Sequence, residues 1–473
     1  MVFSSIAFLG LFFPIVFALY HLTPARFKNG MLALASLVFY AWGEPKFVVI
    51  MLLSVAFNHQ AARFLHRSRH PNLILGLAVS VNLLLLGIFK YAAFAVENFN
   101  WLSTWWGGHA LTIWTIALPI GISFYTFHAI SYLIDIHRGN AAPTRSIVDY
   151  ALYILLFPQL IAGPIIRYKD IHQQIAQRAC SLTDMREGVT RFIIGLGKKV
   201  LIANQMGLLA DVAFGAPAQD LDMATAWIGL VCYSLQIYFD FSGYSDMAIG
   251  LARMFGFRFP ENFNLPYTAT SVQDFWRRWH ISLSTWFRDY VYIPLGGNRG
   301  SAFRTYLNLW CVFLLTGIWH GASWNFVIWG ALHGAALTLE RLIHTRLAPW
   351  SGMLQRLYTL LVVMLAWVFF RCDTLAQAID YLGALFTPAP HPGFMLGRDQ
   401  ALSGYALVVL VVALIMALGL HQTLWRRWGN ALSAHWPPGP LRIAQALLLE
   451  VVLLLAILSM ALGQYNPFIY FRF

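Results

Sequence analysis

The sequence predicts an all-α polytopic membrane protein, a helical bundle with re-entrant elements. Hydrophobic residues make up 59% of its 473 residues and charged residues 11%, whereas soluble domains carry about 25% charged residues. Apolar runs recur along the whole chain, and the polar segments between them are short. Because each crossing needs about 20 apolar residues, crossings use up most of the chain. We therefore expect residues 1–473 to form a single integral-membrane domain.

Twelve apolar stretches are the candidate membrane helices. The first lacks a basic n-region and a small-residue cleavage site, so we expect it to stay as a span and not to be removed as a signal peptide. Several of the others are shorter than a full crossing. The twelve are residues 3–20, 30–42, 45–58, 73–91, 111–134, 190–212, 224–247, 305–318, 322–339, 357–371, 402–420 and 443–462.

The distribution of Lys and Arg predicts the orientation of the chain. The loops 59–72 and 421–442 carry three arginines each and no acidic residue, whereas 201–252 contains neither Lys nor Arg. The positive-inside rule places the two basic loops in the cytoplasm. Alternation then puts both termini in the periplasm and 253–304 inside. Because topology accounts for the net charge of +12, we expect no nucleic-acid partner.

Two regions do not fit simple crossings. Residues 147–166 are apolar but are flanked by basic residues on both sides, which favours a re-entrant or interfacial element. The stretches 305–318 and 322–339 are joined only by a Trp-His-Gly turn at 319–321 and have basic residues at their outer ends. We expect this pair to dip into the membrane from the cytoplasm and return, carrying His320 deep into the protein.

The segment 271–300 is predicted to begin with one interfacial amphipathic helix. Its apolar residues recur at helical spacing, and Ser271 with Asp274 forms a capping-box start. Pro294 followed by a Gly-Gly pair predicts its end. His280 falls on the aromatic face of this helix, so we expect its side chain to turn inward.

His320 is the strongest candidate for chemistry, because an ionisable side chain between two apolar runs needs a reason to be present. Neutral imidazole takes a proton from a hydroxyl near pH 7 and returns it, which acyl transfer to an alcohol requires. Burial favours that neutral form. The alternative is a structural histidine bonded to a neighbouring helix. We expect such a structural role for His128, as a polar contact between spans.

Asp240 and Asp246 lie in an apolar run without Lys or Arg. A carboxylate in such a position must be paired, protonated or facing a cavity. We favour a structural hydrogen-bond network with the neighbouring hydroxyls of Ser242, Tyr244 and Ser245.

Other kinds of site lack support. The sequence contains no P-loop, no H-E-x-x-H and no G-x-S-x-G motif, which argues against ATP hydrolysis, zinc proteolysis and serine-hydrolase chemistry. Its four cysteines have no metal-ligand spacing, so we expect buried small hydrophobes and no metal. They are Cys180, Cys232, Cys311 and Cys372.

Three parts of the chain carry a resemblance to a known family: WRRWHISLSTWFRDYVYIPLGGNRG, the Trp-His-Gly turn at 319–321, and QIYFDFSGYSDMAIGLARMFGFRFPENFNLPY. They resemble the bacterial branch of the membrane-bound O-acyltransferase family, and within it the enzymes that O-acetylate alginate. The likeness extends from the first residues to the final FIYFRF and so covers nearly the whole chain. The resemblance implies a central catalytic cavity at His320, with His320 as the catalytic base. It also implies that His280 orients the reaction or donates to the developing oxyanion.

The resemblance also implies substrates and partners. The donor would be cytoplasmic acetyl-CoA, with no bound cofactor, and the final acceptor an exported polysaccharide, alginate before cellulose or another glycan. The chain would lie in a bacterial inner membrane, in contact with lipid, and work with a separate periplasmic SGNH-type acetyltransferase. Whether the acetyl group goes directly to sugar or to a partner protein stays open.

Five arginines could bind the phosphates of the donor at the mouth of a tunnel. Positive-inside topology alone would place them there too, and both explanations stay open. They are Arg277, Arg278, Arg288, Arg299 and Arg304.

The remaining supporting candidates are Trp319, Asp240, Asp246 and His333. His333 follows His320 by thirteen residues and would share its face on a continuous helix, although the glycine between them can break the register.

Two rival functions stay open. One is the D-alanyl-transfer branch of the same family, with a carrier-protein thioester as donor. The other is a transport or scaffold subunit without enzymatic activity. Inverted-repeat transporters show paired broken helices in two similar halves, and this sequence shows no such symmetry.

Overall fold

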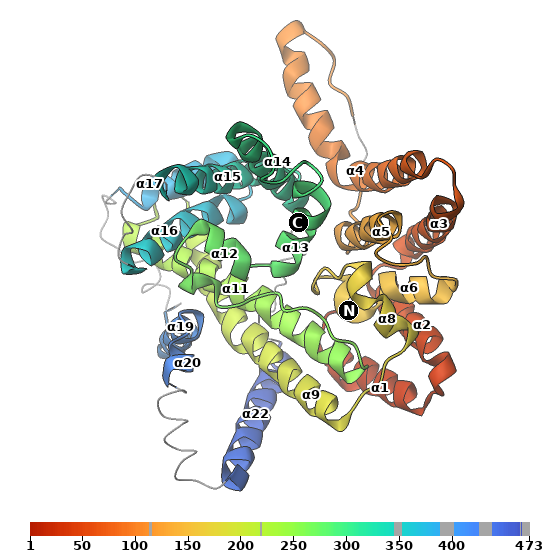
Figure 1. The fold of residues 1–473 in the computed structure, drawn as a ribbon. Helices are drawn as coiled ribbons and strands as arrows, with labels where there is room; N and C mark the ends of the chain where they lie inside the picture. The colour runs from red at the N-terminus through yellow and green to blue at the C-terminus, as the bar shows by residue number, and fades with distance from the viewer. Residues whose placement is uncertain are drawn as a thin grey trace. The chain divides into compact units, whose positions relative to one another are not determined.

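The computed structural model describes residues 1–112, 116–217, 220–344, 352–387, 402–424, 438–463 and 465. All regular secondary structure in these residues is helical, and 79% of them lie in helices (Figure 1). This confirms the predicted all-α class. The arginines of the predicted loop 421–442 at positions 426 and 427, and the final FIYFRF, lie outside the described residues.

Six helical segments in the described residues are long and apolar enough to cross a membrane, and shorter apolar helices occur at Phe8–Leu22 and Gly404–Ala417. A helix is present in each of the twelve predicted stretches. The protein is therefore a multi-pass membrane protein. The six segments are Pro45–Arg67, Pro71–Trp106, Leu182–Gly215, Trp324–Ile343, Gly352–Arg371 and Arg442–Ala461.

Several predicted helix ends are wrong, and one amide pair explains the clearest case. Helix α3 (Val48–Arg67) continues nine residues past the predicted end of its span at 58, so most of the predicted loop 59–72 is helical. The polar side chain at that end, Asn58, is buried against Asn82, with the two amides exchanging hydrogen bonds of 3.0 and 2.7 Å. The polar residue at position 58 therefore marks a contact between two helices and not the end of one, because the two buried amides satisfy each other's hydrogen-bonding groups.

The described chain packs as two compact units, which we call unit 1 and unit 2. Unit 1 comprises Met1–Val189, Ala248–Pro260 and Gly321–Ser323, and unit 2 comprises Thr190–Met247, Glu261–His320 and Trp324–Phe473.

Unit 1 contains the N-terminal helices, of which α5 is the most buried. The apolar stretch 147–166 forms two short helices of nine and four residues, too short for a crossing. The break at Leu156 leaves the Phe157 amide to donate to the Ser36 hydroxyl at 3.1 Å. Besides α3, its helices are α1 (Phe13–Leu22), α2 (Lys28–Gly43), α4 (Pro71–Ser103), α5 (Ile122–His137), α6 (Ile147–Leu155), α7 (Phe157–Leu160) and α8 (Tyr168–Ala176).

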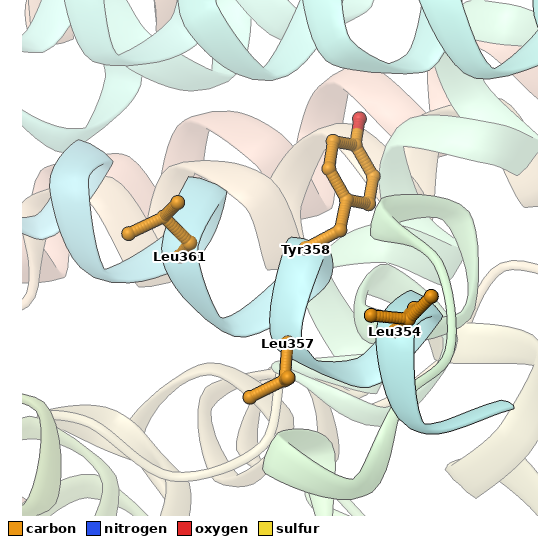
Figure 2. Close-up of a pocket in the computed structure, with 4 residues that line it drawn as sticks. All are labelled: Leu354, Leu357, Tyr358 and Leu361. Atoms are coloured by element: carbon orange, nitrogen blue, oxygen red, sulfur yellow. The ribbon is translucent and has the colours of Figure 1, made fainter. Parts of the chain in front are cut away.

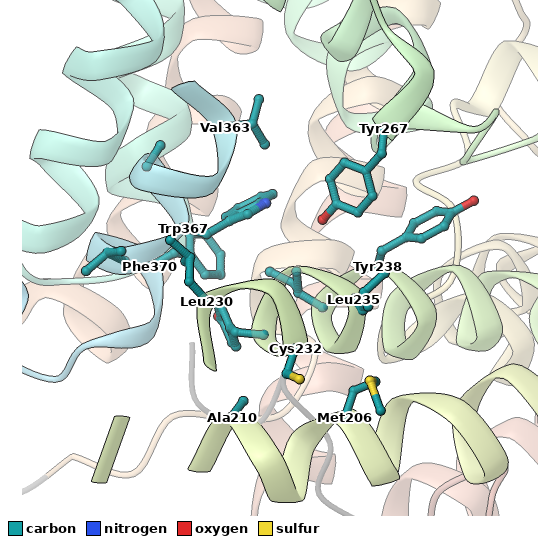
Figure 3. Packing of buried hydrophobic residues seen from close by; sticks show 14 of the residues in the cluster. Met206, Ala210, Leu230, Cys232, Leu235, Tyr238, Tyr267, Val363, Trp367 and Phe370 are labelled. Carbon is teal, nitrogen blue, oxygen red and sulfur yellow. The ribbon is translucent and has the colours of Figure 1, made fainter. Parts of the chain in front are cut away.

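Unit 2 is built around a continuous apolar core between α10, α11 and α16 (Figure 3). Cys232 and Cys372 are buried as predicted, whereas Cys180 and Cys311 are only half-buried. Its helices include α9 (Leu182–Gly197, shared with unit 1), α10 (Asn204–Gly215), α11 (Met223–Met254, also shared), α14 (Ala302–His320), α15 (Trp324–His344), α16 (Gly352–Arg371), α17 (Leu375–Ala384), α19 (Gly404–Ala417), α20 (Leu420–Leu424) and α22 (Pro438–Ala461).

Helices α14 and α15 form a tight hairpin around two glycines. A Cβ atom on Gly317 would lie 2.3 Å from the Phe326 carbonyl oxygen, and one on Gly330 would lie 2.4 Å from the Phe313 carbonyl oxygen. The absence of side chains there lets the two backbones touch. The contact lies one helical turn before the end of α14 at His320.

We predict that Gly330→Ala destabilises the protein by about 1–3 kcal/mol, because the methyl group meets backbone and forces the hairpin apart. The measurement is the thermal midpoint of detergent-solubilised protein. Gly334→Ala is the matched control, since its Cβ would meet Trp310 only at 3.5 Å, an ordinary contact. Equal midpoints for the two variants would contradict the role of this contact.

Candidate active site

The stretch predicted as one helix from Ser271 consists of two short helices and a π-helical turn. Helix α12 is Val272–Arg278, helix α13 is Ile281–Phe287, and the turn is Arg288–Tyr292. The predicted N-terminal cap is confirmed, because the Ser271 Oγ accepts a 2.9 Å hydrogen bond from the residue 274 amide.

The break between α12 and α13 lies at His280, whose φ of +43° is in the left-handed region that residues other than glycine rarely adopt. The next amide, of Ile281, donates to the carbonyl oxygen of Asn262 at 3.0 Å. The prediction of one continuous helix is therefore wrong, because a tertiary hydrogen bond replaces the helical one.

The inward orientation predicted for His280 is confirmed, since its side chain is completely buried. Its ring meets Phe241 edge-on with centroids 4.6 Å apart and lies 6.3 Å from the Trp319 ring. Its Nδ1 is 3.2 Å from the Asn262 Oδ1, and its buried Nε2 has no hydrogen-bond partner among the described residues. Desolvation lowers the pKa of His280 to about 3, so the ring is neutral.

His320 lies at the end of α14 and is 6% exposed. Aromatic rings surround the imidazole: Trp319 at 4.9 Å, Trp329 at 5.0 Å and Phe370 at 5.1 Å between centroids. This confirms that His320 lies deep in the protein. Rings on several sides hold the imidazole in place and limit its contact with water.

His333 is connected to His320 through a shared aromatic contact and not, as the sequence predicted, through a shared helical face. The break at 321–323 ends the helical register between them. Trp329 nevertheless packs against both imidazoles, with its ring centroid 5.0 Å from that of His320 and 4.9 Å from that of His333. The Nε1 of Trp276 donates to the His333 Nδ1 at 3.3 Å, which fixes that ring.

Aromatic contacts therefore connect all three predicted histidines within unit 2. Trp319 lies between His280 and His320, which gives this predicted supporting residue a direct place in the site. Sequence reasoning missed three residues of the site, because their contacts come from separate helices or loops. The missed residues are Asn262, Trp329 and Phe370.

Both predicted carboxylates are paired, but with cations rather than with the neighbouring hydroxyls. Asp240 forms a buried ion pair with Lys199 at 2.7 Å. Asp246 pairs with Lys198 at 2.6 Å and with Arg191 at 2.7 Å. The predicted hydroxyl network is wrong as the main partner, because the cations come from α9 and the π-helical turn that follows it. Neither carboxylate is placed near His320 by these contacts.

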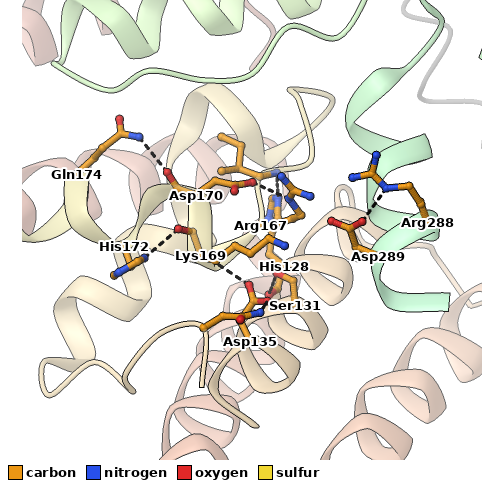
Figure 4. A network of polar contacts seen from close by, with 12 residues as sticks. His128, Ser131, Asp135, Arg167, Lys169, Asp170, His172, Gln174, Arg288 and Asp289 are labelled. Atoms are coloured by element: carbon orange, nitrogen blue, oxygen red, sulfur yellow. Dashed lines mark hydrogen bonds and ion pairs between the residues drawn. The ribbon is translucent and has the colours of Figure 1, made fainter. Parts of the chain in front are cut away.

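The five predicted donor-binding arginines differ in their partners. Arg278 pairs with Asp274 at 2.9 Å, and Arg288 with Asp289 at 2.8 Å (Figure 4). The other three, Arg277, Arg299 and Arg304, are exposed, and no ion pair involves them within the described part of the chain. Exposed guanidinium groups suit phosphate, and their role stays a prediction.

Apolar grooves occur away from the predicted site. One lies on α16 and is lined by Leu354, Leu357, Tyr358 and Leu361 (Figure 2). Another lies between α3 and α4, and neither groove is lined by a predicted site residue. Both lie on candidate spans, where exposed apolar side chains face lipid. The central cavity at His320 stays a prediction.

His128 has a structural role as predicted, but its partner is the non-spanning segment after α7 and not another span. It lies on α5, and its Nε2 accepts a hydrogen bond from the Ile166 amide at 3.2 Å. Its carbonyl oxygen accepts from the Ser131 hydroxyl at 2.9 Å (Figure 4). His128 therefore ties α5 to the segment that follows α7.

Comparison with known proteins identifies the family. Residues 138–376 match the model of the membrane-bound O-acyltransferase family. The chain is 42% identical to a probable alginate O-acetylase of Azotobacter vinelandii over the full length of both proteins. It is 46% identical to the Pseudomonas aeruginosa protein of the same description, over 89% of this chain and 82% of the relative. It is 39% identical to a peptidoglycan O-acetyltransferase of Helicobacter pylori, over 81% of this chain and 79% of the relative.

These matches include the Trp-His-Gly turn and both segments that supply the histidines, 271–300 and 322–339. The chain therefore belongs to the membrane-bound O-acyltransferase family and is a multi-pass O-acyltransferase.

Proposed function

We propose that this enzyme transfers acetyl groups from cytoplasmic acetyl-CoA, across a bacterial inner membrane, for the O-acetylation of an exported polysaccharide. The observation that carries the proposal is His320, buried among three aromatic rings at the end of α14. Relatives described as O-acetylases of alginate and peptidoglycan support acetyl as the group and a glycan as the final acceptor. Alginate is the first candidate, because full-length relatives carry that description.

His320 acts as the base in this proposal. A ring nitrogen accepts the hydroxyl proton while the hydroxyl oxygen attacks the thioester carbonyl. The carbon–sulfur bond breaks, and the proton passes from the imidazolium to the leaving CoA thiolate. The products are an acetyl ester and free CoA, and the histidine is neutral again. Trp319 and Trp329 pack against the His320 ring and connect it to His280 and His333, respectively.

The sidedness follows from the charge distribution. Basic residues gather at 253–304 and are absent from 201–252, which favours a cytoplasmic donor site and periplasmic termini. As the family resemblance implies, a separate periplasmic SGNH-type acetyltransferase would take over the acetyl group and complete the modification.

His320→Ala is predicted to insert normally yet lower acetyl transfer by about 10²–10⁴-fold, the effect of removing a positioned base. His320→Gln should be nearly as inactive, because an amide cannot accept and return the proton. His280→Ala should lower acetyl transfer by a smaller factor than His320→Ala. Acetyl ester on exported polysaccharide, normalised to protein level, measures all three.

His66→Ala is the matched control for the histidine variants, because His66 is exposed. Near-normal acetylation by a well-expressed His320→Ala would remove the proposed mechanism and favour a transport or scaffold role.

Single cysteines at Asp220 and Arg299 should react with a membrane-impermeant thiol reagent from opposite sides of the membrane. Both positions are exposed, and the positive-inside rule puts the first in the periplasm and the second in the cytoplasm. The measurement is labelling of intact cells against inverted vesicles. Labelling of both from one side would refute the orientation.

Arg277→Glu is predicted to raise KM for acetyl-CoA without a matching loss of kcat, because it replaces phosphate attraction by repulsion. Arg69→Glu, at an exposed arginine of the predicted cytoplasmic loop 59–72, is the control for topological effects. If the two variants change protein level alike and KM stays at the wild-type value, Arg277 is an anchor and not a donor contact.

A further inference from the structure

Asn262 is a buried polar residue that the proposed function does not yet use. Its side chain is 1% exposed. Its Oδ1 accepts hydrogen bonds from the Ser282 amide at 3.2 Å and the Ser282 hydroxyl at 2.9 Å, and lies 3.2 Å from the His280 Nδ1. Its Nδ2 donates to the Ser245 hydroxyl at 3.0 Å. Its carbonyl oxygen accepts from the Ile281 amide at 3.0 Å.

The Ser282 amide determines which way the Asn262 side chain points. A backbone N–H can only donate, so the side-chain atom that it meets must be the amide oxygen. The Ser282 hydroxyl, which lies 3.5 Å from the His280 Nδ1, makes its shorter bond of 2.9 Å to the same Asn262 oxygen. The His280 Nδ1 faces that oxygen at 3.2 Å and therefore carries a hydrogen. In a neutral ring with a hydrogen on Nδ1, Nε2 bears a lone pair and can only accept.

The same contacts hold the backbone of His280 in its unusual conformation. The amides of the next two residues, Ile281 and Ser282, both donate to oxygen atoms of Asn262. These bonds stabilise the left-handed turn at His280, which would otherwise be unfavourable for a residue with a side chain. One asparagine thus sets both the backbone and the tautomer of the histidine.

The Nε2 of His280 accepts no hydrogen bond from the described residues. Nε2 is buried and unpartnered among the described residues, and the flanking rings of Phe241 and Trp319 leave the imidazole edge in apolar surroundings. Buried acceptors are normally satisfied. An incoming ligand with an N–H or O–H group would satisfy this one.

We propose that Asn262 is a positioning residue that holds His280 in the Nδ1–H tautomer, so that Nε2 accepts a hydrogen bond from a donor group of a substrate. The proposal rests on the acyl transfer proposed above. It replaces the expected oxyanion role of His280, because an oxyanion needs a donor. Two substrate groups have the right chemistry: an amide N–H of the pantetheine arm of acetyl-CoA, and a hydroxyl of the acceptor other than the reacting one.

Asn262→Leu removes both the acceptor and the donor, whereas Asn262→Asp keeps the oxygen that faces Nδ1. We expect Asn262→Leu to lower kcat/KM by about tenfold or more, the effect of one net hydrogen bond, and Asn262→Asp to recover most of the loss. Ser245→Ala is the matched control, because it breaks only the contact on the far side of Asn262. If Ser245→Ala lowers kcat/KM as much as Asn262→Leu does, Asn262 has only a structural role and the proposal is overturned.

The effect on KM identifies the substrate group. A rise in KM for acetyl-CoA assigns the contact to the donor, and a rise for the acceptor assigns it to the second hydroxyl. If kcat/KM stays at the wild-type value for both substrates in Asn262→Leu, the proposal fails.

The tautomer itself is tested without activity. Ring-¹⁵N-labelled histidine, with His280→Gln to identify the signal, should show a protonated Nδ1 and an unprotonated Nε2 in the wild-type protein. A protonated Nε2 would overturn the inference even in an active enzyme. The expected tautomer in an enzyme that transfers no acetyl group would instead count against the proposed function alone.

Discussion

The pairing of buried polar groups within the helical bundle is the constraint on which this structure depends. An apolar environment offers no water to a buried charge, so each one needs a partner in the protein. Lys199 and Asp240 meet this requirement with both side chains at most 2% exposed. Asn58 and Asn82 do so with neutral amides. Such pairs hold specific helices together, because breaking one would strand a polar group in an apolar interior.

Close backbone contact makes this pairing geometrically possible. A Cβ atom on Gly195 would lie 2.5 Å from the Gly243 carbonyl oxygen, so α9 and α11 touch beside the residues that form the ion pairs. The hairpin of α14 and α15 uses the same device and delivers His320 to its aromatic surroundings. Glycine at these positions lets neighbouring helices approach closely, and the close approach brings polar or catalytic side chains on those helices within reach of one another.

Several buried ring nitrogens have no hydrogen-bond partner among the described residues, in the structural His128 as well as in the site. The Nε2 atoms of His280 and His333 are buried and unpartnered among the described residues, although the other nitrogen of each ring is held by a hydrogen bond. In the rings connected to His320, a fixed orientation and tautomer suit the unpartnered nitrogen to a ligand. The aromatic rings of Trp319 and Trp329 connect both histidines to His320.

Composition and periodicity determined the helical membrane class, the helices in all twelve apolar stretches, the cap at Ser271 and the burial of His320, because these depend on local pattern and hydropathy. Tertiary structure alone decided the break at His280, the cations that pair with Asp240 and Asp246, and the roles of Asn262, Trp329 and Phe370. Each of these depends on contacts between residues on separate helices or loops. The hydrogen bond from the Ile281 amide to the carbonyl oxygen of Asn262 cannot be recognised from the spacing of apolar residues. The sequence pattern therefore predicts a continuous helix through His280, whereas tertiary packing holds that residue in a left-handed turn.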